Sequence, residues 1–156
     1  INYLRYNANM KLVAENKRAR FEYELLETYE AGIVLTGDEI KAVRLGHFSI
    51  NDCYGFVKDD ECFLRNSYIK EYANSFDAGR QGETTRRDRK LLLHKQEIEK
   101  IKKRIAEDHL TIVPTKAYFS DSNLKVEIAV ARGKKLFDKR ETIKNRELDR
   151  KSRFYD

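Results

Sequence analysis

The sequence predicts a mainly β protein with some α structure: one small closed barrel with a few flanking helices and a C-terminal tail. A length of 156 residues suits a single domain. About six runs have the alternating or β-branched composition of short strands, and turn residues separate them. Beyond Gly133 the sequence becomes polar and strongly basic. Nine tyrosines and eight phenylalanines supply bulky apolar surface for a core, although only 40% of the residues are hydrophobic.

The first half of the chain is expected to contribute three strands. They share an aromatic and branched composition bounded by turn residues, and they cover residues 21–35, 51–59 and 61–69. We expect the first and longest strand to be interrupted near Ala31 and Gly32, because glycine inside a strand often marks a bulge. Asp59 and Asp60 favour a turn, so the other two runs form a hairpin.

A short helix is predicted between the first strand and this hairpin, over residues 37–46. The segment lies between two glycines. It starts with acidic residues, which suit the positive end of a helix dipole. Ile40, Val43 and Leu45 are expected on its apolar side.

A long loop and a second helix are expected to follow. Residues 70–87 contain two glycines, many polar side chains and no steady period, which is typical of a functional or disordered loop. The run 89–109 opens with three leucines, which their hydrophobicity assigns to the core. It then places Ile98, Ile101 and Ile105 at spacings of three and four residues, so we expect one amphipathic helix of about four turns.

Two further strands are predicted over residues 111–119 and 124–132, joined by the polar turn 120–123. Apolar residues at every second position of the later strand predict one buried face, formed by Val126, Ile128 and Val130. Pro114 lies inside the earlier strand. Because proline has no N–H to donate, it indicates an edge, a bulge or a strand boundary.

These elements divide the chain into three segments. Residues 1–10 show no period, and we interpret them as an extension or flexible start, with Met10 as the natural first residue. Residues 11–132 form the barrel. Among small closed barrels, the oligonucleotide-binding barrel fits this order of elements best. Residues 133–156 are expected to be disordered alone and to become helical on a partner.

The net charge of +6 is unevenly distributed along the chain. Residues 11–20 carry four basic and one acidic side chain, residues 80–95 six and two, and residues 133–156 nine and five. The remaining residues are therefore net acidic. An acidic body with three basic patches is typical of a protein that meets a polyanion at defined places, although basic side chains also serve solubility alone.

The sequence lacks the residue patterns of an enzyme or a metal site. His47, His94 and His109 lie in separate elements without ligand spacing, and no hydrolase, metalloprotease or nucleotide-binding motif is present. Cys53 and Cys62 lie in apolar runs, and we interpret them as buried, inert thiols of a reducing compartment. We therefore expect a non-catalytic protein with no metal and no cofactor. Since no run could span a membrane and no signal-peptide layout is visible, we expect it in the cytoplasm.

Basic residues beside aromatic ones indicate a nucleic-acid surface near the N-terminus. Lys17, Arg18 and Arg20 precede Phe21 and Tyr23. Cations of this kind neutralise phosphates, and exposed aromatic faces stack on bases. The alternative for Tyr23 is a core position in the first strand.

Four ordered blocks carry a family resemblance: AENKRAR (14–20), YEAGIVLTGDEIKAVRLG (29–46), RKLLLHKQEI (89–98) and VEIAVARGKKLFDKRETIKNRE (126–147). From Met10 to its end, the chain resembles the small protein B family, the partners of transfer-messenger RNA. The resemblance implies an oligonucleotide-binding barrel that binds the tRNA-like domain of that RNA at its elbow and D-loop. It also implies delivery, together with elongation factor Tu and GTP, to stalled bacterial ribosomes. There, trans-translation rescues the ribosome and tags the incomplete protein.

The expected protein is thus a monomeric, non-catalytic RNA-binding adaptor. Composition alone equally permits a ribosomal or ribosome-assembly protein with a basic tail. An acidic cluster that binds Mg²⁺ would instead favour a nuclease.

The resemblance also implies site residues by their place in the family motifs. The RNA-binding set is Asn16, Lys17, Arg18, Arg20, Phe21, Glu30, Leu92 and Lys125. Phe21 stands where many members have histidine, so stacking or packing would replace a hydrogen bond. Glu30 is expected to accept a hydrogen bond from a base edge or hydroxyl, or to orient a nearby cation such as Arg18. The tail set, which enters the small-subunit decoding centre and the empty message channel, is Gly133, Lys134, Lys135, Asp138, Lys139 and Arg140.

Overall fold

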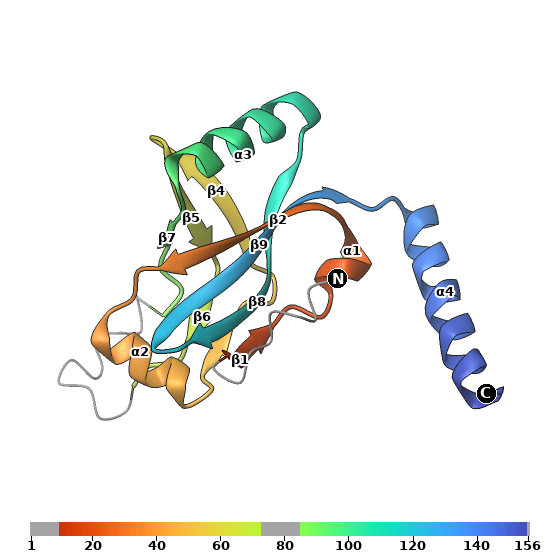
Figure 1. Cartoon of the computed structure of the whole chain (residues 1–156), viewed down its shortest axis with the longest axis horizontal. Helices are drawn as coiled ribbons and strands as arrows, with labels where there is room; N and C mark the ends of the chain where they lie inside the picture. Colours follow the sequence, from red (N-terminus) through yellow and green to blue (C-terminus); the bar gives the residue numbers. More distant parts are fainter. Residues whose placement is uncertain (1–9, 73–84, 156) are drawn as a thin grey trace.

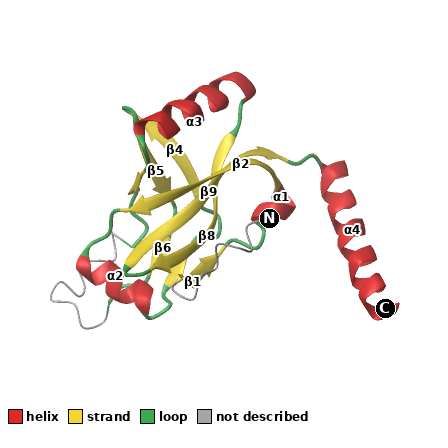
Figure 2. Ribbon diagram, viewed as in Figure 1, coloured by secondary structure: helices red, strands yellow, loops and turns green. Residues whose placement is uncertain are grey.

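A seven-stranded antiparallel sheet closes on itself to form the body of the protein (Figures 1 and 2). The computed structural model describes residues 10–72 and 85–155. The strands of the sheet are β1 (Met10–Glu15), β2 (Tyr23–Ile33), β4 (Tyr54–Lys58), β5 (Glu61–Arg65), β7 (Arg89–Leu92), β8 (Thr111–Ser120) and β9 (Asn123–Gly133). They are ordered β1-β8-β4-β5-β7-β2-β9, and a further β8–β9 pairing closes the ring. The predicted mainly β barrel is confirmed.

Four helices and a small second sheet complete the described part of the chain. The helices are α1 (Ala19–Glu22), α2 (Gly37–Arg44), α3 (Lys95–Asp108) and α4 (Leu136–Tyr155). The strands β3 (Phe48–Ser49) and β6 (Tyr68–Ile69) pair with each other. Helix α3 lies across one end of the barrel and α2 near the other, while α4 extends away from the body (Figure 2).

The core fills the inside of the ring, and strand β9 contributes most to it. Val126, Ile128 and Val130 point inward and are fully buried, as predicted from their alternation. The other face of β9 is apolar as well near its end, because Ala129 and Ala131 are buried in a smaller cluster on the outside of the barrel. Strand β9 is therefore covered on both faces over its second half.

The first long strand differs from the prediction at both ends. Residues 19–22 form the helical turn α1, so the strand starts at Tyr23, and Phe21 is not part of it. The register of β2 against β9 shifts between Leu25 and Glu27, whereas pairing continues unbroken through Ala31 and Gly32. The predicted interruption at the glycine was wrong: there Gly32 allows the close approach of a neighbouring strand instead.

Helix α2 begins where the sequence places it. The Thr36 hydroxyl accepts from the Glu39 N–H (3.2 Å), and the Glu39 carboxylate accepts from the Thr36 N–H (2.9 Å), which is a capping box. Ala42 and Val43 are buried under the helix. Leu45 was wrongly expected on the apolar side, since its side chain follows the last helical residue and is 62% exposed.

The run 89–109 is a strand followed by a helix. Its three leucines start in β7, where Leu91 pairs with Cys62 of β5 and Ile33 of β2. Helix α3 begins only at Lys95. The residue before it, His94, is its N-cap, and the His94 N–H donates to the Glu97 carboxylate (3.1 Å). The predicted helix of about four turns is confirmed as α3, whereas the leucine run before it pairs with two neighbouring strands and belongs to the sheet.

The last strands and the tail follow the sequence closely. Strands β8 and β9 form the predicted hairpin, and their register shifts between Pro114 and Lys116, so the proline lies at a bulge. Residues 136–155 are helical, and α4 begins after a short link from β9 (Figure 1). Whether this helix needs a partner stays a prediction. The interpretation of residues 1–9 also stays a prediction, because these residues lie outside the described part of the chain, as do residues 73–84.

Candidate nucleic-acid interface

Three of the predicted RNA-binding residues come together on one outer face of the barrel. The register pairs Leu92 of β7 with Gly32 of β2, Gly32 with Lys125 of β9, and Lys125 with Tyr118 of β8. Residues opposite one another in an antiparallel ladder share a face, and Glu30 shares that of Gly32 because it lies two positions away. Glu30, Leu92 and Lys125 are thus neighbours although 95 positions separate the first from the last in the sequence.

Leu92 is an exposed apolar side chain beside a glycine. It is 53% exposed, while its neighbour Leu91 is fully buried, so the prediction that all three leucines belong to the core was wrong for this one. A Cβ on Gly32 would lie 3.3 Å from the Leu92 Cβ. The missing side chain therefore gives Leu92 its room on the surface, where it can contact the apolar part of a base or ribose.

Glu30 is held by a tyrosine rather than by the cation that the sequence suggested. The Tyr118 hydroxyl donates a hydrogen bond to Glu30 Oε2, and the Lys116 ammonium lies 6.0 Å from the centre of the Tyr118 ring. Arg18 instead pairs with Glu22, 3.4 Å away. Because Tyr118 is almost fully buried, its hydroxyl fixes an exposed carboxylate in one orientation on the face shared with Leu92 and Lys125.

Asn16 anchors the basic N-terminal motif to the barrel. Its backbone N–H donates to the Thr115 carbonyl (2.8 Å), and its side-chain Nδ2 donates to the Pro114 carbonyl (3.1 Å), both at the bulge of β8. Lys17 and Arg18 follow on the surface. Asn16 therefore positions the two exposed cations, which can reach phosphates.

Phe21 and Arg20 contact the root of the tail. The Lys134 ammonium donates to the Arg20 carbonyl (2.9 Å), and the Lys134 N–H donates to the Glu22 carbonyl (2.9 Å). The Phe21 ring lies 6.0 Å from the Lys139 ammonium and 5.8 Å from the Arg146 guanidinium. Phe21, which the resemblance places among the RNA-binding residues, thus packs beside tail cations.

The remaining tail residues lie apart from the three-residue face on β2, β7 and β9. Gly133 ends β9 opposite Tyr23, and Lys135 and Arg140 are exposed. Asp138 belongs to α4, but its side chain lies outside the described residues. The structure therefore separates the face of Glu30, Leu92 and Lys125 from the helical tail, which contacts the predicted residues Arg20 and Phe21 at α1.

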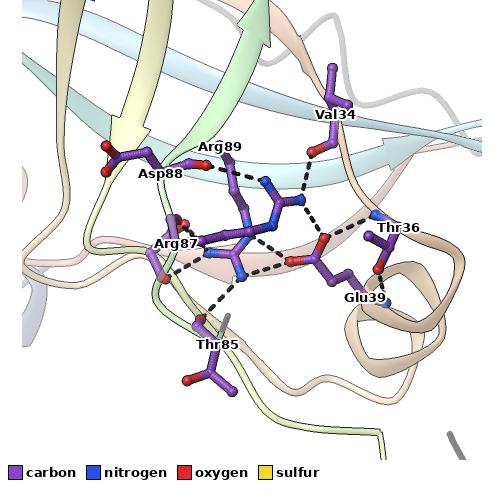
Figure 3. Close-up of polar contacts among 8 residues, drawn as sticks. Val34, Thr36, Glu39, Thr85, Arg87, Asp88 and Arg89 are labelled. Carbon is purple, nitrogen blue, oxygen red and sulfur yellow. Dashed lines mark hydrogen bonds and ion pairs between the residues drawn. The ribbon is translucent and has the colours of Figure 1, made fainter. Parts of the chain in front are cut away.

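A buried ion-pair cluster fixes strand β7, which carries Leu92. Figure 3 shows the Glu39 carboxylate between the guanidinium groups of Arg87 and Arg89. Its two oxygens accept from Arg87 (2.5 Å) and from Arg89 Nε (2.9 Å). The Arg89 side chain is fully buried, and it also donates to the carbonyls of Ser67 (2.8 Å) and Thr85 (3.1 Å). Burial alone would raise the pKa of Glu39, but hydrogen bonds from Arg87 and Thr36 and the charge of Arg89 hold it below its usual value.

This cluster was not predicted from the sequence, and it changes how the basic segment 80–95 is interpreted. The basic excess over residues 80–95 was expected to face RNA, yet Arg89 is buried and Arg87 is paired. The signal available in the sequence was the capping box from Thr36 to Glu39, which places the acid at the start of α2. Nothing local reveals that its partners lie about fifty residues further along.

The residues that the structure describes give little support for a metal site, a reactive thiol or a membrane span. Within 10–72 and 85–155, no group of three or more His, Cys, Asp or Glu side chains could hold a metal ion. Cys53 and Cys62 are buried, as predicted, and burial raises their pKa to about 12 and about 11. None of the helices in this part of the chain is long and apolar enough to cross a membrane.

Comparisons with known proteins identify the family of this chain. A profile of the SmpB protein family matches residues 13–154. The SsrA-binding protein of Solidesulfovibrio magneticus is 49% identical over 140 residues, which cover 90% of this chain and 89% of the relative. The SsrA-binding protein of Mycoplasma mycoides subsp. mycoides SC is 47% identical over 140 residues, with coverage of 90% and 93%. A solved structure described as "tmRNA-SmpB: a journey to the center of the bacterial ribosome" is 43% identical, has a TM-score of 0.62, and covers 78% of this chain and 84% of its own. The resemblance seen in the four sequence blocks is confirmed: this chain belongs to the SmpB protein family.

Proposed function

We propose that this protein is an RNA-binding adaptor of trans-translation. It binds the tRNA-like domain of transfer-messenger RNA and delivers it, with elongation factor Tu and GTP, to stalled ribosomes in the bacterial cytoplasm. It catalyses no reaction itself and acts as a monomer. The observation that carries the proposal is the convergence of Glu30, Leu92 and Lys125 on one face of a closed barrel. The names of the relatives, which are SsrA-binding proteins, support the same RNA.

The three residues on the barrel face have complementary roles. Lys125 supplies a positive charge for a phosphate, and Leu92 offers an apolar contact to a base or ribose. Glu30, held by Tyr118, accepts a hydrogen bond from a base edge or a 2′-hydroxyl. Such a set reads the shape of a folded RNA through its backbone and unpaired bases, which suits a tRNA-like elbow.

The tail has a separate role on the ribosome. Residues 133–140 cover the end of β9, a two-residue link and the start of α4, and their basic side chains suit a channel lined by ribosomal RNA. Removal of the chain after Lys135 keeps the contacts of Lys134 with α1. We expect this truncation to leave affinity for transfer-messenger RNA within about twofold and to abolish tagging in a reconstituted translation assay. A large loss of RNA affinity would contradict the separation of roles.

The identity of the RNA is tested by capture from the source cell. The full chain is purified under native conditions, and the bound RNA is sequenced. One dominant transfer-messenger RNA supports the proposal. Its absence, with the protein retained on salt-washed ribosomal subunits, would instead indicate a ribosomal or assembly protein.

The barrel face is tested through the salt dependence of RNA binding. Replacement of Lys125 by alanine should weaken binding and lower the slope of log K against log salt by about 1, since one phosphate contact is lost. The matched control is Lys100→Ala, because Lys100 is an exposed lysine on α3, at the end of the barrel. An unchanged slope for Lys125→Ala would show that this lysine touches no phosphate.

A further inference from the structure

A groove of about 640 Å³ opens beside the basic N-terminal motif, and its lining includes Asn16 and Arg18, whose contacts are described above. One wall is residues 15–18, before α1, and the other is the turn from Asn51 into Tyr54. Its size falls in the range of sites that hold small ligands, roughly 300–1,000 Å³. The groove does not include Glu30, Leu92 or Lys125, so it is a separate feature of the same protein.

The groove carries charges of both signs. Lys17 and Arg18 belong to the lining and are exposed, so they can meet phosphates. The lining also includes the carboxylates of Glu15, Glu22 and Asp52. Carboxylates repel a phosphate but accept hydrogen bonds from the N–H groups of a base. The groove therefore offers acceptors to a nucleobase and cations to its phosphate.

Aromatic walls complete this arrangement. Tyr23 and Tyr54 both line the groove, and Tyr54 is 41% exposed. Tyr54 lies opposite Arg65 in the β4–β5 ladder, and Arg65 makes two hydrogen bonds to Asp88 (3.0 and 2.9 Å). An exposed ring on a strand offers a base a stacking surface.

The acidic wall is well fixed. Asp52 has a left-handed backbone, with φ of 61°, and its carbonyl accepts from Asn66 Nδ2 (3.1 Å). The opposite wall is fastened to β8 through Asn16. Both sides of the groove are thus positioned before any ligand arrives.

We propose that this groove binds an unstacked guanine of the RNA that the protein carries or meets. Guanine presents two adjacent N–H donors on its Watson–Crick edge, which one carboxylate accepts together. Asp52 accepts from that edge, Tyr54 stacks on the ring, and Lys17 or Arg18 meets the flanking phosphate. The inference rests on the proposed function, because it requires an RNA partner.

The test replaces Asp52 by asparagine in the full chain. Asparagine has the same shape and tolerates a left-handed backbone. Loss of a negative charge beside a polyanion should tighten non-specific binding, whereas a base-reading carboxylate predicts weaker binding. We expect about tenfold lower affinity for the RNA that supplies the guanine. The matched control is Asp59→Asn, since Asp59 is also exposed and left-handed (φ 51°) but lies outside the groove.

Two RNAs distinguish the source of the base. Binding is measured to a transfer-messenger RNA transcript and to salt-washed ribosomes, each with the parent chain and both variants. A glyoxal reagent, which modifies N1 and N2 of unpaired guanine, then reports which guanine the parent chain protects. Protection that Asp52→Asn removes and Asp59→Asn keeps supports the inference and identifies the RNA.

Three outcomes would overturn it. The first is tighter or unchanged binding of Asp52→Asn to both RNAs. The second is the absence of any protected guanine that depends on Asp52. If the parent chain still binds transfer-messenger RNA in these two cases, the proposed function stands and only the groove assignment falls. The third is that the parent chain binds neither RNA, which would remove the proposed function and the groove assignment together.

Discussion

Replacement of Glu39 by glutamine should destabilise the barrel by several times more than loss of a surface carboxylate. Glu39 is 12% exposed, and it is the counter-charge of Arg89, whose side chain is fully buried. A hydrogen bond to a charged group contributes about 1.5–3 kcal/mol, and removal of one partner from a buried ion pair costs about 3–5 kcal/mol. Glutamine keeps the shape and can still accept one bond. We therefore expect a loss of about 2 kcal/mol for Glu39→Gln and about 4 kcal/mol for Glu39→Ala.

The assay is urea unfolding of the full chain, followed by circular dichroism. The matched control is Glu61→Gln, because Glu61 pairs with Lys90 at 3.0 Å while both side chains are more than 40% exposed. An exposed pair of this kind contributes at most about 1 kcal/mol. A Glu39→Gln loss below about 0.5 kcal/mol, with an unchanged denaturant slope, would refute the assignment of this cluster as a buried clamp.

The pH dependence provides an independent check on the same residue. The pKa of Glu39 lies below its ordinary value of 4.5 in the folded protein. The stabilisation by the charged carboxylate is therefore fully present above that ordinary pKa, and it is lost as the pH falls through the lower folded pKa. We expect the difference between the parent chain and Glu39→Gln to be constant near neutral pH and to shrink in acid. A difference that grows as the pH falls would contradict the sign of the shift.

Two further predictions concern the closure of the barrel and its thiols. A Cβ on Gly55 would lie 2.7 Å from Ile112 Cγ2, at the residue pair where β4 meets β8, so Gly55→Ala should cost about 1–3 kcal/mol in urea unfolding. An effect below 0.5 kcal/mol would show that the two strands can separate freely. Because burial raises the pKa of Cys53 and Cys62 to about 12 and about 11, iodoacetamide should modify neither in the folded protein and both in urea. Rapid modification under native conditions, monitored by mass spectrometry, would contradict the buried position.

Strands were predictable where alternation is long, and unpredictable where an apolar run is short. The eleven residues of β9 show the period directly, from Val126 through Val130, and its hairpin with β8 was predicted from sequence. Strand β7 has only four residues, and Leu91 is its only buried apolar one. A run of three leucines before a helical pattern fits either structure. The choice is made by β2 and β5, which lie on either side of β7 in the sheet and are distant in the sequence.

The charge pattern predicted a partner but not the position of each cation. The basic excess around residues 80–95 includes Arg87 and Arg89, which both pair with Glu39, and the Arg89 side chain is fully buried. In contrast, Lys17 and Arg18 are exposed as expected. Net charge over a window cannot tell these cases apart, because pairing with an acid about fifty residues away leaves no trace in the local sequence.

The short strand β7 links the buried ion-pair cluster of Glu39, Arg87 and Arg89 to the face that carries Leu92. Leu92 pairs only with Gly32 of β2, and β5 pairs with the other three residues of the strand. The end of β7 that carries Leu92 is therefore held on one side alone, while Arg89 fastens its start. Weaker ion pairs at Arg89 would let β7 shift against Gly32 of β2, where the two strands already approach closely. Stability and RNA affinity should thus fall together when the clamp is weakened, although none of its three side chains lies on the face proposed to bind RNA.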